Sequence, residues 1–261
     1  AAIRKAGAST AMRAIDHHAW TNRWRGWHPA EKLLPAGSLL ILTLMLPPLT
    51  TAPLVLTGMM VATVRGAGVP LQTLLRVLAA PATFLLAGIP FLAVSVDFAE
   101  GVNLHLSAEG LRLALTTTVR ALAAMSCLAF LILTTPLTDW IAPLRRIGVP
   151  AGVIELILLI YRLIFVFFER ALTGHQAQTA RLGYSRVDRS VRSLGLLAGN
   201  LFQRSLAQAQ RLEIGLAARG YHGELRVLAP RWNLSWTRLM TGLGLVGLIG
   251  TAGGLLARGL S

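Results

Sequence analysis

Four long stretches of the chain contain no Asp, Glu, Lys or Arg. They are Leu33–Val64, Val77–Val96, Ala121–Thr138 and Leu239–Ala257. A helix of about 20 apolar residues crosses the roughly 30 Å hydrocarbon layer of a membrane. The first stretch is longer and contains Pro47, Pro48 and Pro53, and proline does not continue a helix, so we interpret it as two spans joined by a tight turn. The pattern predicts an all-α polytopic membrane protein with about five transmembrane helices.

The composition excludes most soluble classes. Only 14% of the residues are charged, 54% are hydrophobic, and the mean hydropathy is +0.60. Soluble domains carry roughly 25% charged residues, and a chain with so few could not cover a water-exposed surface. The single cysteine, Cys127, excludes a disulfide scaffold and every cysteine-based metal motif.

The predicted spans divide the chain into four parts. We expect spans near residues 33–48, 52–66, 75–97, 110–136 and 237–258. The corresponding domains are a cytoplasmic N-terminal segment (1–32), a four-span membrane domain (33–136), a cytoplasmic or interfacial helical domain (137–235) and a C-terminal transmembrane helix (236–261). The residues before the first apolar stretch lack a short apolar core with a small-residue cleavage site, so we expect no cleavable signal.

The loop charges predict an orientation. The formal net charge is +14, and residues 1–32 hold six basic side chains against two acidic ones. Arg65 and Arg76 bracket a later loop, whereas the connection that carries Asp97, Glu100 and Glu109 has no basic residue. Because basic loops stay on the cytoplasmic side, we expect the N-terminus and residues 139–235 to be cytoplasmic.

The stretch between Asp139 and Trp236 has a different composition. It holds thirteen arginines, no lysine and six acidic residues. We predict a short helix over Leu137–Ile147 and two long helices, from about Ala151 to Arg181 and from about Val187 to Arg219. The first long helix is apolar nearly all round at its start, so we expect it to begin in the bilayer and leave it. The second is amphipathic, which is typical of a helix at the membrane interface or packed on other helices.

The two long helices end in similar sequences. The candidate site residues are Ala180, Arg181 and Leu182 at the first end and Ala218, Arg219 and Gly220 at the second. Gly183 and Gly220 are expected to supply the left-handed stop of each helix, and arginine suits the negative end of the helix dipole. A guanidinium can also bind a carboxylate or carbonyls with two parallel bonds. Ordinary helix capping is the alternative, and the repetition at both ends favours a shared function.

With these residues placed, the chain resembles the transmembrane T component of energy-coupling factor (ECF) transporters, in particular the cobalt-type CbiQ family. Ile15-Asp16, Asn22-Arg23-Trp24 and the run from His28 to Leu33 are similar to the segment that opens that family. Ala218-Arg219-Gly220 matches the family's Ala-Arg-Gly motif. Ala180-Arg181-Leu182 departs from it at the third position, where glycine is delayed to Gly183.

The resemblance implies a non-catalytic coupling subunit in the bacterial plasma membrane. In this family the two arginine-bearing tips dock into grooves on a pair of ABC-type ATPase subunits. The same chain holds a substrate-binding membrane subunit, which is CbiM-like for cobalt and which a small CbiN-like subunit can accompany. The expected process is cobalt uptake that feeds cobalamin biosynthesis. ATP hydrolysis is assigned to the partners, and this sequence has no G-x-x-x-x-G-K-[ST] run.

Three other functions fit the sequence less well. The six histidines show no metal-ligand spacing, so we expect no metal site and no cofactor in this chain. They are His17, His18, His28, His105, His175 and His222. A membrane enzyme would need a histidine or carboxylate beside the polar groups of the spans. None stands beside them in the uncharged stretches, so a membrane enzyme is not expected. These polar groups are Ser38, Thr43, Thr57, Ser95, Ser126 and Cys127. Nucleic-acid binding is not expected, because the arginines alternate with leucine and phenylalanine on amphipathic helices. A T component for nickel or a vitamin stays open.

Two smaller features were also interpreted. Glu155, Arg162 and Glu169 recur seven residues apart on the first long helix. They either relay motion between the helices or simply face neighbouring helices, and the second interpretation is favoured. The glycine-rich run Gly242–Gly254 lies in an apolar span and predicts close helix packing through small residues.

Overall fold

The structure is a computed structural model that describes residues 16–97, 103–221 and 232–259. The chain divides into two compact units. One holds the described residues up to Asp139 together with those after Arg231, and the other holds residues 140–221. Apart from one small hairpin, the described secondary structure is helical, as the sequence predicts.

The described residues of the first unit form a helical turn at residues 16–21 and five longer helices. They are α2 (Pro29–Met45), α3 (Pro48–Val61), α4 (Leu71–Ala93), α5 (Ala108–Thr134) and α9 (Trp236–Gly259). α3 continues into a π-helical turn, η1 (Ala62–Gly66). The break between α2 and α3 is shorter than expected, because Pro48 starts α3 as its first residue, where a missing N–H costs no helical bond.

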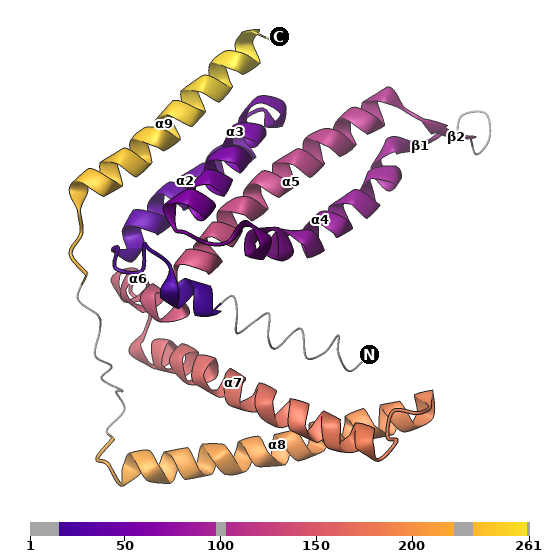
Figure 1. The fold of residues 1–261 in the computed structure, drawn as a ribbon, viewed down its shortest axis with the longest axis vertical. Coiled ribbons are helices and arrows are strands. Elements are labelled where there is room, and N and C mark those ends of the chain that lie inside the picture. Colours follow the sequence, from indigo (N-terminus) through magenta and orange to yellow (C-terminus); the bar gives the residue numbers. More distant parts are fainter. Residues whose placement is uncertain (1–15, 98–102, 222–231, 260–261) are drawn as a thin grey trace. The chain divides into compact units, whose positions relative to one another are not determined.

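α5 is the central helix of this unit. It packs against α2, α3 and α4, and its buried face is built mainly from small residues such as Ala114, Ala123 and Ala129. α4 and α5 are joined by the hairpin of β1 (Val94–Asp97) and β2 (Asn103–Leu106), which pair antiparallel with Val94 opposite Leu106. The sequence did not predict these strands. Figure 1 shows them at the far end of the α4–α5 pair.

α9 packs on α2 and α3 through glycines, as the sequence predicts. A Cβ on Gly242 would lie 2.7 Å from Pro35 Cγ, and one on Gly253 would lie 2.3 Å from Thr51 Cγ2. Without side chains at these positions the backbones approach closely, which is how helices associate in a membrane. Gly242 lies against Pro35 and Gly250 lies against Leu42, so α9 runs parallel to α2.

Within the described ranges, five helices are long and apolar enough to cross a membrane. They are Pro48–Gly66, Leu71–Ala93, Ala108–Thr134, Ala151–Ala180 and Trp236–Arg258. Four coincide with predicted spans. The predicted span 33–48 falls on α2, whose 17 residues are short for a crossing of about 20. Ala151–Ala180 qualifies instead, because its first half is almost wholly apolar.

The second unit contains α6 (Ile141–Arg146), α7 (Ala151–Ala180) and α8 (Val187–Ala217), preceded by a 3-10 turn, η2 (Leu137–Trp140). Gly148, with φ 88°, separates α6 from α7, as the sequence predicts. α7 and α8 cross where Gly174 faces Leu197, since a Cβ on Gly174 would lie 2.6 Å from Leu197 Cδ1. Figure 1 shows this pair of long helices and their crossing.

Candidate functional site

The end of α7 is closed by a Schellman motif. The N–H of Gly183 donates to the carbonyl of Gln178 over 2.9 Å, and the N–H of Leu182 donates to the carbonyl of Thr179 over 3.0 Å. These are the two bonds that define the motif. Leu182 carries the left-handed conformation, with φ 57°, and is the only non-glycine residue with positive φ among the described residues.

The end of α8 has the same motif 38 positions later. The N–H of Tyr221 donates to the carbonyl of Leu216 over 3.1 Å, and the N–H of Gly220 donates to the carbonyl of Ala217 over 3.0 Å. Gly220 has φ 71°. Leu182 and Gly220 therefore occupy equivalent backbone positions, and Arg181 and Arg219 each directly precede the left-handed residue.

The prediction that Gly183 supplies the left-handed stop is wrong. Its φ is not positive, because Leu182 has already reversed the chain. Gly183 is needed for a close contact instead: a Cβ there would lie 2.7 Å from Ser193 Oγ and 2.9 Å from the Gln178 carbonyl oxygen. At the second end, Gly220 does supply the left-handed residue, as predicted.

All six predicted site residues are exposed. Within the described parts of the chain, the guanidinium groups of Arg181 and Arg219 make no hydrogen bond or ion pair. Each therefore lies at the negative end of a helix dipole with its planar donor face available to another molecule. Such a group can form two parallel bonds to a carboxylate or to backbone carbonyls.

The first tip, residues 178–184, is held to α8 by side chains. Gln178 Nε2 donates to the carbonyl of Ser193 over 3.0 Å, and Tyr184 Oη donates to Gln178 Oε1 over 2.6 Å. Ser193 Oγ donates to the carbonyl of Gly183 over 2.9 Å. The ring of Tyr184 stacks on His175 with a centroid separation of 4.5 Å. This network fixes the first tip against the start of α8.

The second tip, residues 216–221, is held to α7 by one described side-chain bond. Tyr221 Oη donates to Glu155 Oε2 over 2.8 Å, and this hydrogen bond raises the pKa of Tyr221 above its ordinary value. Glu155 therefore has a partner on the second tip, which the sequence pattern of Glu155, Arg162 and Glu169 did not indicate.

The structure does not bring the two arginines together. The first tip lies against the start of α8, and the second lies against Glu155 near the start of α7. α7 and α8 are thus antiparallel, with one arginine at each end of the pair. The 26 helical residues from 155 to 180 correspond to about 39 Å at 1.5 Å per residue.

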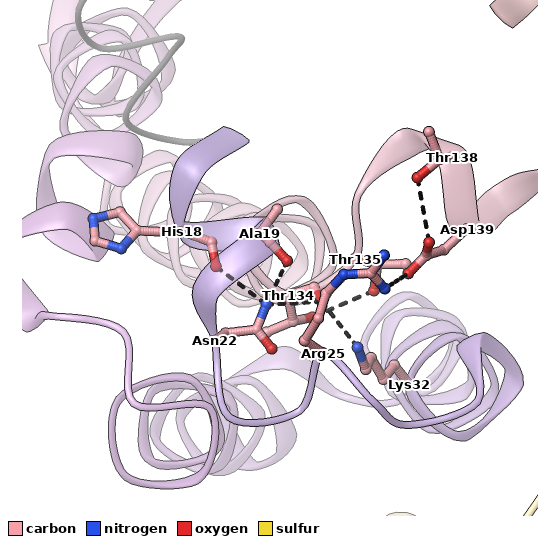
Figure 2. Close-up of polar contacts among 9 residues, drawn as sticks. All are labelled: His18, Ala19, Asn22, Arg25, Lys32, Thr134, Thr135, Thr138 and Asp139. Atoms are coloured by element: carbon pink, nitrogen blue, oxygen red, sulfur yellow. Dashed lines mark hydrogen bonds and ion pairs between the residues drawn. The ribbon is translucent and has the colours of Figure 1, made fainter. Parts of the chain in front are cut away.

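A buried polar cluster in the first unit was missed by the sequence reasoning (Figure 2). It joins residues of the N-terminal segment to the end of α5. Lys32 Nζ donates to the carbonyl of Thr134 over 2.9 Å, and Asn22 Nδ2 donates to the same oxygen over 3.2 Å. Arg25 Nη1 donates to Asp139 Oδ2. Lys32 and Asn22 thus bind the carbonyl of Thr134, which lies at the end of α5 and has no intrahelical partner.

The cluster is largely removed from solvent. Lys32 is 2% exposed and Asp139 is 0% exposed. Burial raises the pKa of Asp139, and the positive charges of Arg25 and Lys32 oppose that rise. Because an unpaired buried charge costs several kcal/mol, the cluster gives a structural reason for Asn22, Arg25 and Lys32. Sequence alone offers no sign that residues 25 and 139 pair.

His28 and His18 make structural contacts. His28 Nδ1 accepts the N–H of Ala30 and caps α2, and His18 Nε2 lies 3.2 Å from Thr73 Oγ1. Among the described residues, no three His, Cys, Asp or Glu side chains are grouped so that they could hold a metal ion. His222 lies outside the described residues.

Comparisons with known proteins agree on one family. The family described as CbiQ, cobalt transport protein, matches residues 21–229. The cobalt transport protein CbiQ of Rhodobacter capsulatus is 39% identical over 218 residues, which cover 84% of this chain and 88% of that protein. CbiQ of Salmonella typhimurium is 28% identical over 228 residues, which cover 83% of this chain and 100% of that protein. A fused cobalt transport protein CbiMQ of Methanocorpusculum labreanum is 36% identical over 121 residues, which cover 46% of this chain and 20% of that protein.

Proposed function

The chain belongs to the CbiQ family of cobalt transport proteins, and we propose that it is the membrane coupling subunit of an ECF-type importer for cobalt. In this proposal it transmits the motion of two ABC-type ATPase subunits to a separate membrane subunit that binds the ion. It carries out no catalysis itself. The N-terminus and the α7–α8 pair lie on the cytoplasmic side of a bacterial plasma membrane.

One observation carries the proposal: the two arginine tips have the same backbone hydrogen bonds. Arg181 and Arg219 are exposed and precede a left-handed residue in each motif. Two equivalent contact points at the two ends of one helix pair suit a pair of identical or similar partner subunits. Ala180 and Ala218 add little bulk, so each tip can enter a groove.

The long helices supply the mechanical link. α7 has 30 residues and α8 has 31, so each extends about 45 Å. When the ATPases bind ATP and close, they move the two tips. Because Gln178 or Tyr221 bonds each tip to the other long helix, a displacement of one tip also moves that helix.

The remaining partner is a substrate-binding membrane subunit. The fused CbiMQ relative supports a CbiM-like partner, since fusion joins segments that act together. We assign cobalt coordination to that subunit, and a small CbiN-like subunit can accompany it. The described residues of this chain offer no ligand cluster that would compete for this role.

The test is a double substitution, Arg181→Ala together with Arg219→Ala. Loss of a hydrogen bond that involves a charged group costs about 1.5–3 kcal/mol, roughly tenfold or more in each docking equilibrium. We expect each single variant to impair cobalt uptake and the double variant to lose it, with poor rescue by lysine. Uptake and co-purification of the ATPase subunits are measured at equal membrane abundance.

Arg211→Ala is the matched control, because Arg211 is an exposed arginine of α8 outside the tip. It should leave uptake and co-purification unchanged. If the double variant retained both, the two arginines would be ordinary helix caps and the coupling proposal would be wrong.

A further inference from the structure

A groove of about 800 Å³ lies between α2, α3 and α9 in the first unit. Its volume falls in the range of sites that enclose most of a small molecule. The walls along the three helices are apolar and include Leu39, Leu54, Leu245 and Ile249. Leu245 is 55% exposed, so this part of the groove is open to whatever surrounds the helices.

Charged side chains line the same groove at one end. Glu31 lies at the start of α2, Arg238 at the start of α9, and Arg65 in the π-helical turn that follows α3. α9 runs parallel to α2, and α3 runs antiparallel to both, so these three positions meet at one end. Trp24 and Trp27 lie there too, stacked with centroids 4.4 Å apart. Paired tryptophans beside arginines are typical of the membrane–water interface.

The charged end has an excess of positive charge. Arg238 lies 3.9 Å from the Glu31 carboxylate and stacks over Trp27 at 4.8 Å. Arg65 makes no hydrogen bond or ion pair with any part of the chain that the structure describes. Lys32, which also lines the groove, already donates to the Thr134 carbonyl. Two arginines therefore face one carboxylate, which favours an anionic group such as a phosphate.

Glu31 places a second requirement on a ligand of the groove. Its Oε1 accepts the N–H of Ser235 over 2.6 Å, whereas its Oε2 is buried and receives no hydrogen bond. The Glu31 side chain is 0% exposed. A buried carboxylate oxygen without a donor is costly, and this residue lines the groove. A fitting ligand therefore brings a hydrogen-bond donor close to its anionic group.

We propose that this groove binds one phospholipid whose headgroup carries a hydrogen-bond donor, such as ethanolamine or glycerol. The phosphate lies between Arg65 and Arg238, the headgroup donor reaches Glu31 Oε2, and an acyl chain follows Leu39, Leu245 and Ile249. An apolar helix of a partner protein would cover the walls but leave Arg65 unpaired and leave Glu31 Oε2 with only its 3.9 Å ion pair to Arg238, which is too long for a hydrogen bond. The charge pattern therefore favours the lipid.

The test is lipid binding to the purified full-length chain, measured by native mass spectrometry after delipidation. Phosphatidylethanolamine, phosphatidylglycerol and phosphatidylcholine with identical acyl chains are added separately. We expect the first two to bind about tenfold or more tightly than phosphatidylcholine, whose choline has no N–H or O–H donor. Glu31→Gln should reduce the difference in affinity between these two lipids and phosphatidylcholine, because the glutamine amide no longer needs a donor from the headgroup.

Different substitutions test the charged end and the apolar part of the groove. Arg65→Ala and Arg238→Ala should each weaken binding about tenfold, whereas Arg76→Ala, at an exposed arginine of α4 that does not line the groove, should not. Leu245→Trp fills the apolar part without touching the polar end and should also weaken binding. Equal affinity for the three lipids, or wild-type affinity in the Arg65→Ala/Arg238→Ala variant, would overturn the proposal.

A photocrosslinking residue at position 245, in the complex assembled in native membranes, identifies the occupant directly. A lipid adduct supports the proposal. An adduct to a partner protein would show that a helix covers the groove and would overturn it.

Discussion

At the end of α7 the left-handed residue is Leu182, and at the end of α8 it is Gly220. The backbone hydrogen bonds of the two ends correspond one to one. For an L-residue with a side chain, the left-handed conformation costs roughly 1–2 kcal/mol, whereas glycine adopts it freely. The same turn therefore forms at different cost at the two tips.

The contacts around the two tips offset this difference. The first tip has three side-chain hydrogen bonds that involve Gln178, Tyr184 and Ser193, and an aromatic stack on His175. The second tip has the bond from Tyr221 to Glu155. A strained turn persists where the surrounding structure fixes it. The comparison shows that a helix tip can be set by its own backbone preference or by its neighbours.

The largest difference between the tips is expected for Gln178→Ala. The substitution removes the bond from Gln178 to the Ser193 carbonyl and leaves the Tyr184 hydroxyl without its acceptor in a partly buried site, which costs about 1–3 kcal/mol. We expect faster amide hydrogen exchange at residues 182–184 and no change at residues 219–221. Gln176→Ala, an exposed glutamine on the same helix, serves as the control. Unchanged exchange at the first tip would show that the network does not hold Leu182.

Changing the left-handed residue of each tip should have a smaller effect on stability, and the sign should differ between the two tips. Gly220→Ala should destabilise the second tip by about 1 kcal/mol, because alanine resists a φ of 71°. Leu182→Gly should stabilise the first tip by less than that, since the greater freedom of glycine in the unfolded chain offsets part of the gain. Exchange rates at the amides of residues 183 and 221 report both changes.

Gly215→Ala provides the contrast within α8. A Cβ at Gly215 would meet nothing within 4 Å, and the residue is helical, so alanine should stabilise the helix by about 1 kcal/mol. If Gly220→Ala stabilised the protein as Gly215→Ala does, the left-handed turn at the second tip would be wrong.

The smallest effect is expected for Tyr221→Phe, which removes the single hydrogen bond from Tyr221 to Glu155. Exchange at the second tip should rise slightly, and less than Tyr184→Phe raises it at the first. The pKa of Tyr221 is raised in the folded state, so the bond is fully present below about pH 10, the ordinary value for tyrosine, and is lost as the pH rises through the higher folded value. The pH dependence should disappear in Tyr221→Phe. A Phe variant that kept it would assign the titration to another group.

Much of the fold follows from the sequence alone. The uncharged stretches, the prolines at 47 and 48 and Gly148 predicted the helices and most of their boundaries, because these features act within one or two turns of the chain. The two arginine ends were also recognisable from local sequence. Their equivalent positions could not be read fully: Gly183 was predicted as the left-handed stop, whereas Leu182 takes that conformation, beside the bonds that Ser193 and Tyr184 make to Gly183 and Gln178.

Only the tertiary structure determined the contacts between distant residues. Arg25 and Asp139 are 114 positions apart, Glu31 and Ser235 are 204 apart, and Glu155 and Tyr221 are 66 apart. No periodicity encodes such pairs, since each depends on which helix faces pack together. The sequence determines where the charges lie along the chain relative to the apolar stretches, and packing decided which of them are buried, paired or left facing the groove between α2, α3 and α9.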